Sequence, residues 1–244
     1  RDYAVWQGKF FQTDDFKSKE KYWLNIFKDE PPLLELNTDY PRHPVQLYDS
    51  DYVPIMAGYD LTKRLKRIAK ENGTTLYTVL LAALNVLFLK YTGQEDITIG
   101  TLTAGRSRPG LERIIGMFVN TVVIRNFPCR KKTFLNFLNE VKDNTIKAID
   151  HEEYPFELLV NEVDVYRNTG RNPIFDIMFS LDNDEYFFKD TGGITLRKFP
   201  FESSMTQFDM FIHVLEINED MHFKWKYRKD IFKKDTVKRL AEHF

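Results

Sequence analysis

The sequence is poor in cysteine and has no apolar run of membrane length. Cys129 is the single cysteine among 244 residues, so an internal disulfide is excluded and a reducing cytosol is expected. It lies between a predicted strand and a predicted helix, and we interpret it as a loop thiol rather than a nucleophile. A spanning helix needs about eighteen consecutive apolar residues. The longest apolar stretch, 76–91, is interrupted by Thr78 and Asn85 and predicts a buried core helix.

An excess of charge of one sign is also missing. The 35 basic and 36 acidic side chains leave a net charge of −1, which argues against a nucleic-acid or membrane-surface partner. The first residues, RDYAVWQGKF, contain neither an initiator methionine nor the apolar segment of a signal peptide. We therefore expect a cytoplasmic protein and a piece cut from a longer chain.

Signatures of several enzyme classes are absent as well. The five histidines include no pair with metal-site spacing such as H-x-x-x-H, so no metal site is expected. The sequence has no G-x-S-x-G nucleophile elbow and no H-H dipeptide. Composition, spacing and periodicity alone define a cytosolic α/β protein with one well-placed arginine, Arg106, and no assembled active site.

What the sequence does contain is an alternation of helix and strand signals. Polar caps and apolar stripes predict helices that begin near Thr13 or Asp14, Asp60, Thr74 or Thr75, Thr133, Pro155, and Lys234 or Asp235. Apolar alternation predicts strands at 48–59, 96–105, 118–127, 172–181, 194–199, 208–217 and 221–228, the first of them an edge strand because of Pro54. Since the last strands look antiparallel, we predict an α/β fold with a mixed sheet flanked by helices.

The stretch GTLTAGRS, residues 100–107, resembles a phosphate-binding loop with arginine in place of lysine. Such a loop must lead directly into a helix whose free N–H groups face the phosphate. Pro109 and Gly110 follow closely, so we favour a glycine-bearing turn at a strand end over nucleotide binding. Arg106 leaves the strand end, where it is well placed for a buried or cleft ion pair.

Asn120 and Thr121 begin a strand that is otherwise rich in valine and isoleucine, in the stretch IIGMFVNTVVIR. Polar groups at that place need hydrogen-bond partners if they are buried. A structural link to a neighbouring loop and a role in a cleft are equally good interpretations, and both stay open.

His151 lies in AIDHEEYPFELL, between two predicted helices. A histidine at a helix C-terminus interacts favourably with the helix dipole, and Glu152 and Glu153 lie just before the next helix, where negative charge is favourable. Residues adjacent in sequence seldom face each other well enough to act as base and orienting group. We therefore favour a structural joint over a catalytic base for His151, with Pro155 in the first turn of the second helix.

Four stretches together resemble the condensation domains of nonribosomal peptide synthetases. They are RDYAVW, IGMFVNTVVIR, HEEYPFE and RNTGRNPIF, which are similar in order to the family's Y-x-D-[FY]-A-V-W, G-x-F-V-N-T, H-Q-D-Y-P-F-E and R-D-x-S-R-N-P-L segments. Glu152, Glu153 and Asn168 are mild departures from these patterns. The family's H-H-x-x-x-D-G segment normally precedes the first stretch, and it does not occur in this sequence.

The resemblance implies the C-terminal lobe of a two-lobed fold similar to chloramphenicol acetyltransferase. Residues 1–45 would form a helix and a proline-rich connector from the preceding lobe, and residues 46–244 the lobe proper. The implied activity is amide-bond formation between two aminoacyl or peptidyl thioesters on phosphopantetheine, in a tunnel between the lobes. The expected partners are the N-terminal lobe of the same domain, the upstream and downstream carrier-protein domains and the adjacent adenylation domain. The fragment alone is expected to be inactive and to bind no cofactor of its own.

The resemblance also implies roles for individual residues, none of them catalytic. Arg106, beside Gly105, is expected to pair with the aspartate of the missing histidine segment, with a surface ion pair as the alternative. Asn120 is expected to face the tunnel, and Thr206 and Asp209 in SSMTQFD to lie near a pantetheine arm. Residues of the other two motifs are expected to be structural: His151, Pro155, Phe156, Arg171, Asn172 and Pro173.

Three other functions stay open. The first is a non-catalytic module that docks carrier proteins, the second is an epimerising or heterocyclising relative within the family, and the third is a nucleotide-binding protein that uses GTLTAGRS. A lobe separated from its partner is also expected to expose an apolar face and to self-associate.

Overall fold

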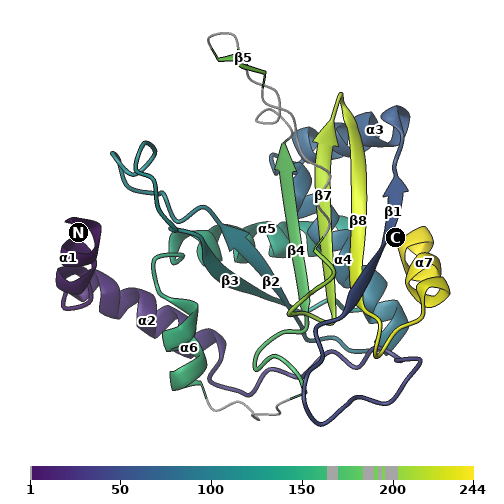
Figure 1. The fold of residues 1–244 in the computed structure, drawn as a ribbon, viewed down its shortest axis with the longest axis horizontal. Helices are drawn as coiled ribbons and strands as arrows, with labels where there is room; N and C mark the ends of the chain where they lie inside the picture. Colours follow the sequence, from purple (N-terminus) through teal and green to yellow (C-terminus); the bar gives the residue numbers. More distant parts are fainter. Residues whose placement is uncertain (1, 164–169, 184–189, 192–193, 196–202) are drawn as a thin grey trace.

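The computed structural model describes residues 2–163, 170–183, 190–191, 194–195 and 203–244. Its centre is a six-stranded sheet in the order β1-β8-β7-β4-β2-β3, flanked by helices (Figure 1). The strands are β1 Ser50–Met56, β2 Ile97–Thr103, β3 Asn120–Asn126, β4 Ile177–Asn183, β7 Met210–Ile217 and β8 Asp220–Arg228, with β5 Asp190–Thr191 and β6 Ile194–Thr195 in a separate pair. β4 runs parallel to β2 and β7 while the other pairs are antiparallel, so the predicted mixed sheet is confirmed.

The helices begin mostly where polar caps predict them. They are α1 Asp2–Phe10, α2 Asp14–Ile26, α3 Tyr59–Glu71, α4 Leu76–Thr92, α5 Phe134–Asp150, α6 Phe156–Glu162 and α7 Lys234–His243. Thr13, Thr75 and Thr133 each accept a hydrogen bond from a backbone N–H of the following helix, so these three predicted caps are confirmed. The prediction for Asp60 was wrong, because α3 begins one residue earlier, after Gly58, and no side chain caps it.

Several predicted boundaries also shift. The strand expected at 172–181 begins only at Ile177, because the residues before it turn to place Arg171 against Asp176. Of the strand expected at 194–199, only 194–195 are among the described residues, and they form β6. α1 was not predicted, although its aromatic residues at positions 3, 6 and 10 have helical spacing.

The hydrophobic core lies between one face of the sheet and the helices behind it. Trp225 and Val214 are fully buried on this face. They belong to the same hydrophobic cluster as Leu81, Leu84 and Phe88 of α4, which are also fully buried. The expected buried helix at 76–91 is therefore α4, and Gly93 ends it as predicted.

Across the residues that the structure describes, no single helix is long and apolar enough to cross a membrane. α3 and α4 pass such a test only as a pair, and they are bent by 103° relative to each other.

The sheet is divided where β2 meets β4. These two strands are joined at one position, Gly100 opposite Met178, whereas β2 pairs with β3 and β4 with β7 along their whole lengths. A Cβ atom on Gly100 would lie 2.2 Å from the Phe175 ring, so only glycine allows this close approach. Beyond it the two strands diverge, and β2, β3, α1, α2 and α6 form a wing beside the rest of the sheet (Figure 1).

Candidate functional site

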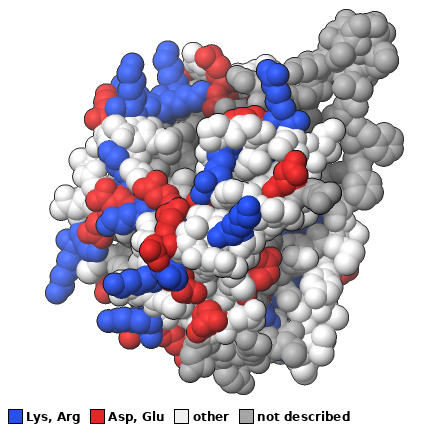
Figure 2. All heavy atoms as spheres, turned by 90° about the vertical axis from the view of Figure 1, so that its left-hand side faces the viewer, with Lys and Arg blue, Asp and Glu red and all other residues white. Residues whose placement is uncertain are grey.

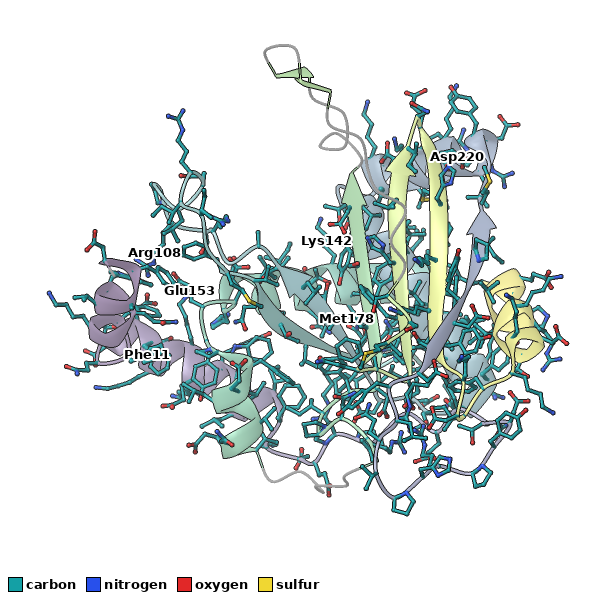
Figure 3. The ribbon with its side chains drawn as sticks, in the orientation of Figure 1. Phe11, Arg108, Lys142, Glu153, Met178 and Asp220 are labelled. Atoms are coloured by element: carbon teal, nitrogen blue, oxygen red, sulfur yellow. The ribbon has the colours of Figure 1, made fainter. Side chains whose placement is uncertain are left out.

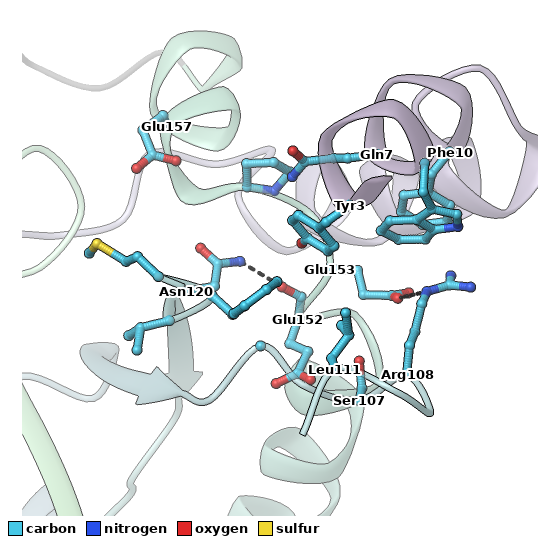
Figure 4. A pocket seen from close by; sticks show the side chains of 16 residues that line it. Tyr3, Gln7, Phe10, Ser107, Arg108, Leu111, Asn120, Glu152, Glu153 and Glu157 are labelled. Atoms are coloured by element: carbon cyan, nitrogen blue, oxygen red, sulfur yellow. Dashed lines mark hydrogen bonds and ion pairs between the residues drawn. The ribbon is translucent and has the colours of Figure 1, made fainter. Parts of the chain in front are cut away.

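A cavity of about 230 Å³ lies between α1, the loop that follows β2, and the HEEYPFE joint (Figure 4). Its lining brings together three of the four motif stretches: Tyr3 and Trp6 from α1, Phe118 and Asn120 from the loop, and Glu152, Glu153 and Pro155 from the joint. These segments are far apart in sequence, so the tertiary fold assembles them.

Arg108 connects all three walls of this cavity. Its guanidinium lies over the Trp6 ring at 4.2 Å and over the Phe10 ring at 5.0 Å. Its Nε donates a hydrogen bond to Glu153 Oε1 at 2.6 Å (Figure 4). Glu153 Oε2 lies 3.3 Å from the Lys19 Nζ of α2. One carboxylate therefore ties the loop to α2, and one guanidinium ties the loop to α1.

Tyr3 closes the cavity from α1. Its ring makes an edge-on contact with Phe118, with the ring centroids 4.8 Å apart. Burial raises the pKa of the Tyr3 hydroxyl, the charge of Glu153 raises it further, and Arg108 opposes the shift. The hydroxyl therefore stays protonated at neutral pH and serves as a neutral polar group.

Arg106 braces the loop from inside. Its guanidinium donates to the carbonyl oxygens of Leu111, Ile114 and Gly116, the last two at 2.9 and 3.2 Å, and lies 4.4 Å from the Phe118 ring centroid. No carboxylate within the described ranges pairs with Arg106. Its expected pairing with an aspartate of the histidine segment therefore stays a prediction.

Gly105 is required by the geometry of the same loop. Its φ angle is +61°, and a Cβ atom there would lie 1.8 Å from the Phe118 carbonyl oxygen. Any side chain here would push apart the two loop segments that carry residues 105 and 118. A residue with a side chain would also have to adopt an unfavourable backbone conformation. Gly105 thus fixes where Arg106 leaves the strand.

Asn120 forms a link between the start of β3 and the joint, while also lining the cavity. Its Nδ2 donates to the carbonyl oxygens of Glu152 at 2.6 Å and Tyr154 at 3.0 Å, and its Oδ1 accepts from the Thr121 N–H at 2.9 Å. The amide has both of its hydrogens engaged with the protein. The geometry supports the structural link directly, and a role toward a substrate stays a prediction.

His151 lies at the C-terminal end of α5, packed against α2. Its Nδ1 lies 2.7 Å from the Lys147 carbonyl oxygen, and its ring stacks on Tyr22 with the centroids 3.9 Å apart. Its own carbonyl accepts from Trp23 Nε1 at 3.0 Å. Pro155 precedes α6, which begins at Phe156. The joint therefore packs α5 and α6 against α2.

Arg171 and Asp209 belong to a buried group of charges at the lower end of the sheet, which we call the base cluster: Arg42, Arg171, Arg228, Asp176 and Asp209. Arg42 binds both carboxylate oxygens of Asp209, with Nη1 to Oδ1 at 2.9 Å. Arg228, with no exposed surface, adds a contact to the same Oδ1 at 3.2 Å. Arg171 binds Asp176, with Nε to Oδ2 at 3.0 Å.

Asp176 is the member of the base cluster whose negative charge is least well compensated. Burial and the nearby charge of Asp209 raise its pKa to about 6, and Arg171 and Arg42 oppose the shift without cancelling it. Its Oδ1 is buried and has no hydrogen-bond partner in the described structure. Asp176 is therefore held by Arg171 through one oxygen only, and the other is desolvated without compensation.

Thr206, Asn172 and Pro173 lie around the base cluster. The Thr206 N–H donates to the Tyr48 carbonyl at 2.8 Å, and its hydroxyl accepts from the Phe208 N–H at 3.3 Å. Asn172 donates to the Gln207 carbonyl at 2.7 Å, and Pro173 follows it in the turn toward Asp176. The structure thus places Thr206 in a turn beside the connector, where it lines an open hollow of about 270 Å³ with Tyr48 and Met205.

Sequence reasoning missed Arg42, Arg108 and Arg228. Arg108 is separated from Trp6 by about a hundred residues, and Arg42 from Asp209 by 167, so no local pattern marks either pairing. The alternation of β8 buries the residues at 221, 223, 225 and 227, so it places Arg228 on the opposite face and gives no sign that Arg228 is buried. Across the described residues no cluster of three metal-binding side chains occurs.

Charges on the wing are interspersed by sign. Figure 2 shows the face that carries α1 and α2, where basic and acidic side chains alternate with uncharged surface. Among the described residues visible on this face, basic and acidic side chains are mixed rather than gathered by sign.

Comparison with known proteins identifies the family. The sequence profile of the Condensation domain family matches residues 1–244. The chain is 46% identical over its whole length to tyrocidine synthase 3 of Brevibacillus parabrevis and 45% identical to gramicidin S synthase 2 of Aneurinibacillus migulanus. This chain belongs to the condensation domain family of nonribosomal peptide synthetases.

The chain spans only 4% and 6% of the lengths of these two relatives. Among solved structures, the X-domain from teicoplanin biosynthesis superposes with a TM-score of 0.88 at 20% identity, covering 99% of this chain and 56% of that one. A four-domain nonribosomal peptide synthetase bound to AMP and glycine superposes with a TM-score of 0.86 at 23% identity, covering 94% of this chain and 19% of that one. The fold is therefore that of condensation domains.

Proposed function

We propose that this chain forms one wall of the tunnel in a condensation domain that joins two carrier-bound acyl groups by an amide bond. The observation that carries this proposal is the convergence of three family motifs on the cavity walled by Trp6, Asn120 and Glu153. A catalytic fold that relies on positioning needs such a shaped wall, because holding two reactants in line supplies much of the rate acceleration.

The proposed reaction requires few chemical groups from this wall. An amine attacks the carbonyl carbon of a thioester, a C–N bond forms and the C–S bond breaks. The amine loses one proton, and the departing thiolate gains one. A thioester is already activated, so the remaining requirements are alignment and removal of the amine proton.

We propose further that the group that handles the proton lies on a preceding lobe. The sequence contains no H-H dipeptide, and a matching solved domain is nearly twice the length of this chain. In this arrangement residues 1–45 link the lobes and 46–244 form the second lobe. Arg106 would then hold the aspartate of the histidine segment, in addition to the loop carbonyls that it already binds.

Exposed apolar side chains on the loop after β2 support the proposal that a preceding lobe packs against this chain. Ile115 and Met117, at the tip of the loop after β2, are 101% and 91% exposed. Apolar side chains so exposed, on a loop braced by an internal arginine, favour a contact surface over a free loop. We propose that the preceding lobe covers them.

The proposed partners follow from this reaction. Two carrier-protein domains would present their thioesters on phosphopantetheine arms, one from each end of the tunnel, and an adenylation domain would lie next in the same polypeptide. Thr206 and Asp209 would lie near one of these arms. The single cysteine supports a cytoplasmic setting.

Amide formation between two loaded carrier proteins tests the proposal. The chain joined to its preceding lobe should give the amide product, and the chain alone should give none above a no-enzyme control. Loss of product on replacing the histidines of the preceding lobe would place proton transfer there. Product from the chain alone would overturn the division of labour, and no product from the joined protein would overturn the reaction itself.

A further inference from the structure

A second cavity, of about 420 Å³, opens where β2 and β4 diverge. One side is formed by β2, including Leu102. The other side is formed by β4, including Ser180 and Asp182. Its floor comes from the helices behind the sheet, with Tyr77 from α4 and Ile149 from α5. The cleft therefore passes into the helical layer, and it exists because β2 and β4 pair only at Gly100. Its volume falls in the range of about 300–1,000 Å³ that is usual for small-molecule sites.

Tyr77 places a polar atom without a partner on this floor. Its ring is fixed by stacking on Phe179, with the centroids 5.1 Å apart. Its hydroxyl is buried and has no hydrogen-bond partner of normal geometry among the described residues. Burial raises its pKa, and Thr101 on the same cleft opposes that shift without making a well-formed hydrogen bond. A buried polar group left unpaired costs about 1–3 kcal/mol. A group that enters the cleft and bonds this hydroxyl would recover that cost.

The cleft is open to solvent and has one charged edge. Two of its lining residues, Leu102 and Ile149, are 43% and 45% exposed although they are large and apolar. Asp182 lies on the opposite edge, where its Oδ2 is 2.8 Å from the Nε2 of His213. Val119, immediately before Asn120, also lines the cleft, so the loop that bounds the first cavity bounds the second as well.

We propose that this cleft binds the side chain of a thioester-bound aminoacyl group, and that it favours an aromatic or aliphatic side chain with a hydrogen-bonding atom at its tip. The inference rests on the proposed amide-forming reaction, which would bring such a group to this wall. Apolar walls would take the body of the side chain, and the Tyr77 hydroxyl would pair with its tip. Asp182 stays at the rim, in water.

Filling the cleft from its floor tests the assignment. Ile149→Trp adds bulk inside the cleft, and Ile146→Trp makes the same change three residues earlier on α5, at a site that is 49% exposed and does not line the cleft. In the complete synthetase that contains this chain, Ile149→Trp should lower kcat/KM at least tenfold for a tyrosyl or phenylalanyl group. It should change the value for a glycyl group less than twofold. Ile146→Trp should leave both within twofold of the parent.

A gentler variant keeps the test valid if the tryptophan disturbs folding. Tyr77→Phe removes the unpaired hydroxyl and leaves the ring stack on Phe179 in place. It should reduce the preference for a tyrosyl over a phenylalanyl group about fivefold, with a melting temperature equal to or above that of the parent, because the uncompensated buried hydroxyl is gone. An unchanged preference would show that the hydroxyl does not meet the substrate, and it would overturn the assignment.

Two arms of the experiment identify which substrate enters. The side chain is varied first on the upstream carrier with glycine downstream, and then on the downstream carrier with glycine upstream. Discrimination that responds to Ile149→Trp in one arm assigns the cleft to that substrate. Amide formation with no response in either arm would overturn the cleft assignment alone. Absence of amide from the unmodified synthetase in both arms would instead overturn the proposed function on which it rests.

Discussion

The base cluster and the wing both use arginines to hold distant segments together, but in opposite surroundings. In the base cluster, Arg228 has no exposed surface and its carboxylate partner Asp209 is 2% exposed. In the wing, the side chains of Arg108 and Glu153 are 39% and 19% exposed and border a cavity. We call the wing group the loop cluster: Trp6, Arg106, Arg108, Phe118 and Glu153. Figure 3 shows Arg108 and Glu153 between α1 and the sheet.

The difference shows which region has polar partners for its charges among the described residues. Buried arginines of the base cluster find carboxylates and carbonyls inside the chain, as with Arg228, which binds Asp209, Asp230 and the Gly170 carbonyl. A buried charge without such partners would be strongly unfavourable. The loop cluster has aromatic faces and a half-exposed ion pair around an open cavity. We infer that the base cluster fixes the fold and that the loop cluster holds one side of a shared site.

Replacing a base-cluster arginine should have the largest effect. Arg228→Met leaves Asp209 and Asp230 short of a buried partner, so the free energy of unfolding should fall by about 3–5 kcal/mol, measured by urea denaturation. Arg239→Met makes the same change at an exposed position on α7 and should alter it by less than about 0.5 kcal/mol. Equal effects of the two variants would mean that the base cluster contributes nothing specific.

Gly105→Ala tests the backbone of the loop cluster and should have the next largest effect. The new Cβ atom would meet the Phe118 carbonyl oxygen, which lies 1.8 Å from its position, at a φ of +61°. We expect a loss of about 2 kcal/mol, visible as a lower melting temperature. Gly110→Ala is the matched control, because its φ is also positive, +92°, but no atom lies within 4 Å. A control loss as large as that of Gly105→Ala would argue against the steric contact.

Asp176 gives the base cluster a dependence on pH. Its folded pKa of about 6 lies above the ordinary value of 3.8, so the folded state binds the proton more tightly than the unfolded state. The stability that Asp176 contributes is present below pH 4 and is lost as the pH rises through 6. Asp176→Asn should therefore gain stability relative to the parent between pH 4 and 6.5, by on the order of 1 kcal/mol. A difference that is constant with pH would contradict the raised pKa.

Arg108→Ala should have the smallest effect on stability. It removes the stacking on Trp6 and the half-exposed ion pair with Glu153, which together contribute about 1 kcal/mol. Arg113→Ala, on the exposed part of the same loop, is the control and should change the melting temperature little. A loss at Arg108 that matches the loss at Arg228 would remove the contrast between the two clusters.

The sequence predicted local structure better than the assembled sites. Thr13, Thr75 and Thr133 begin helices because a side-chain oxygen next to an apolar stripe is a local signal. Asp60 also offers a side-chain oxygen, but the φ of +82° at Gly58 lets the helix begin earlier. The four motif stretches identified the family before any geometry. Local patterns could not show that Arg108 would reach Trp6 and Glu153, or that β2 and β4 would separate beyond Gly100, because both depend on tertiary packing.

Hydrogen exchange compared between this chain alone and the chain joined to its preceding lobe tests most directly the claim that the loop cluster is one side of a shared site. We expect backbone amides at 107–119 to exchange at least tenfold more slowly in the joined protein, because the exposed Ile115 and Met117 become covered. Amides next to the base cluster, at 171–176 and 226–229, should exchange at the same slow rate in both. Equal exchange of the 107–119 amides in the two proteins would contradict the claim.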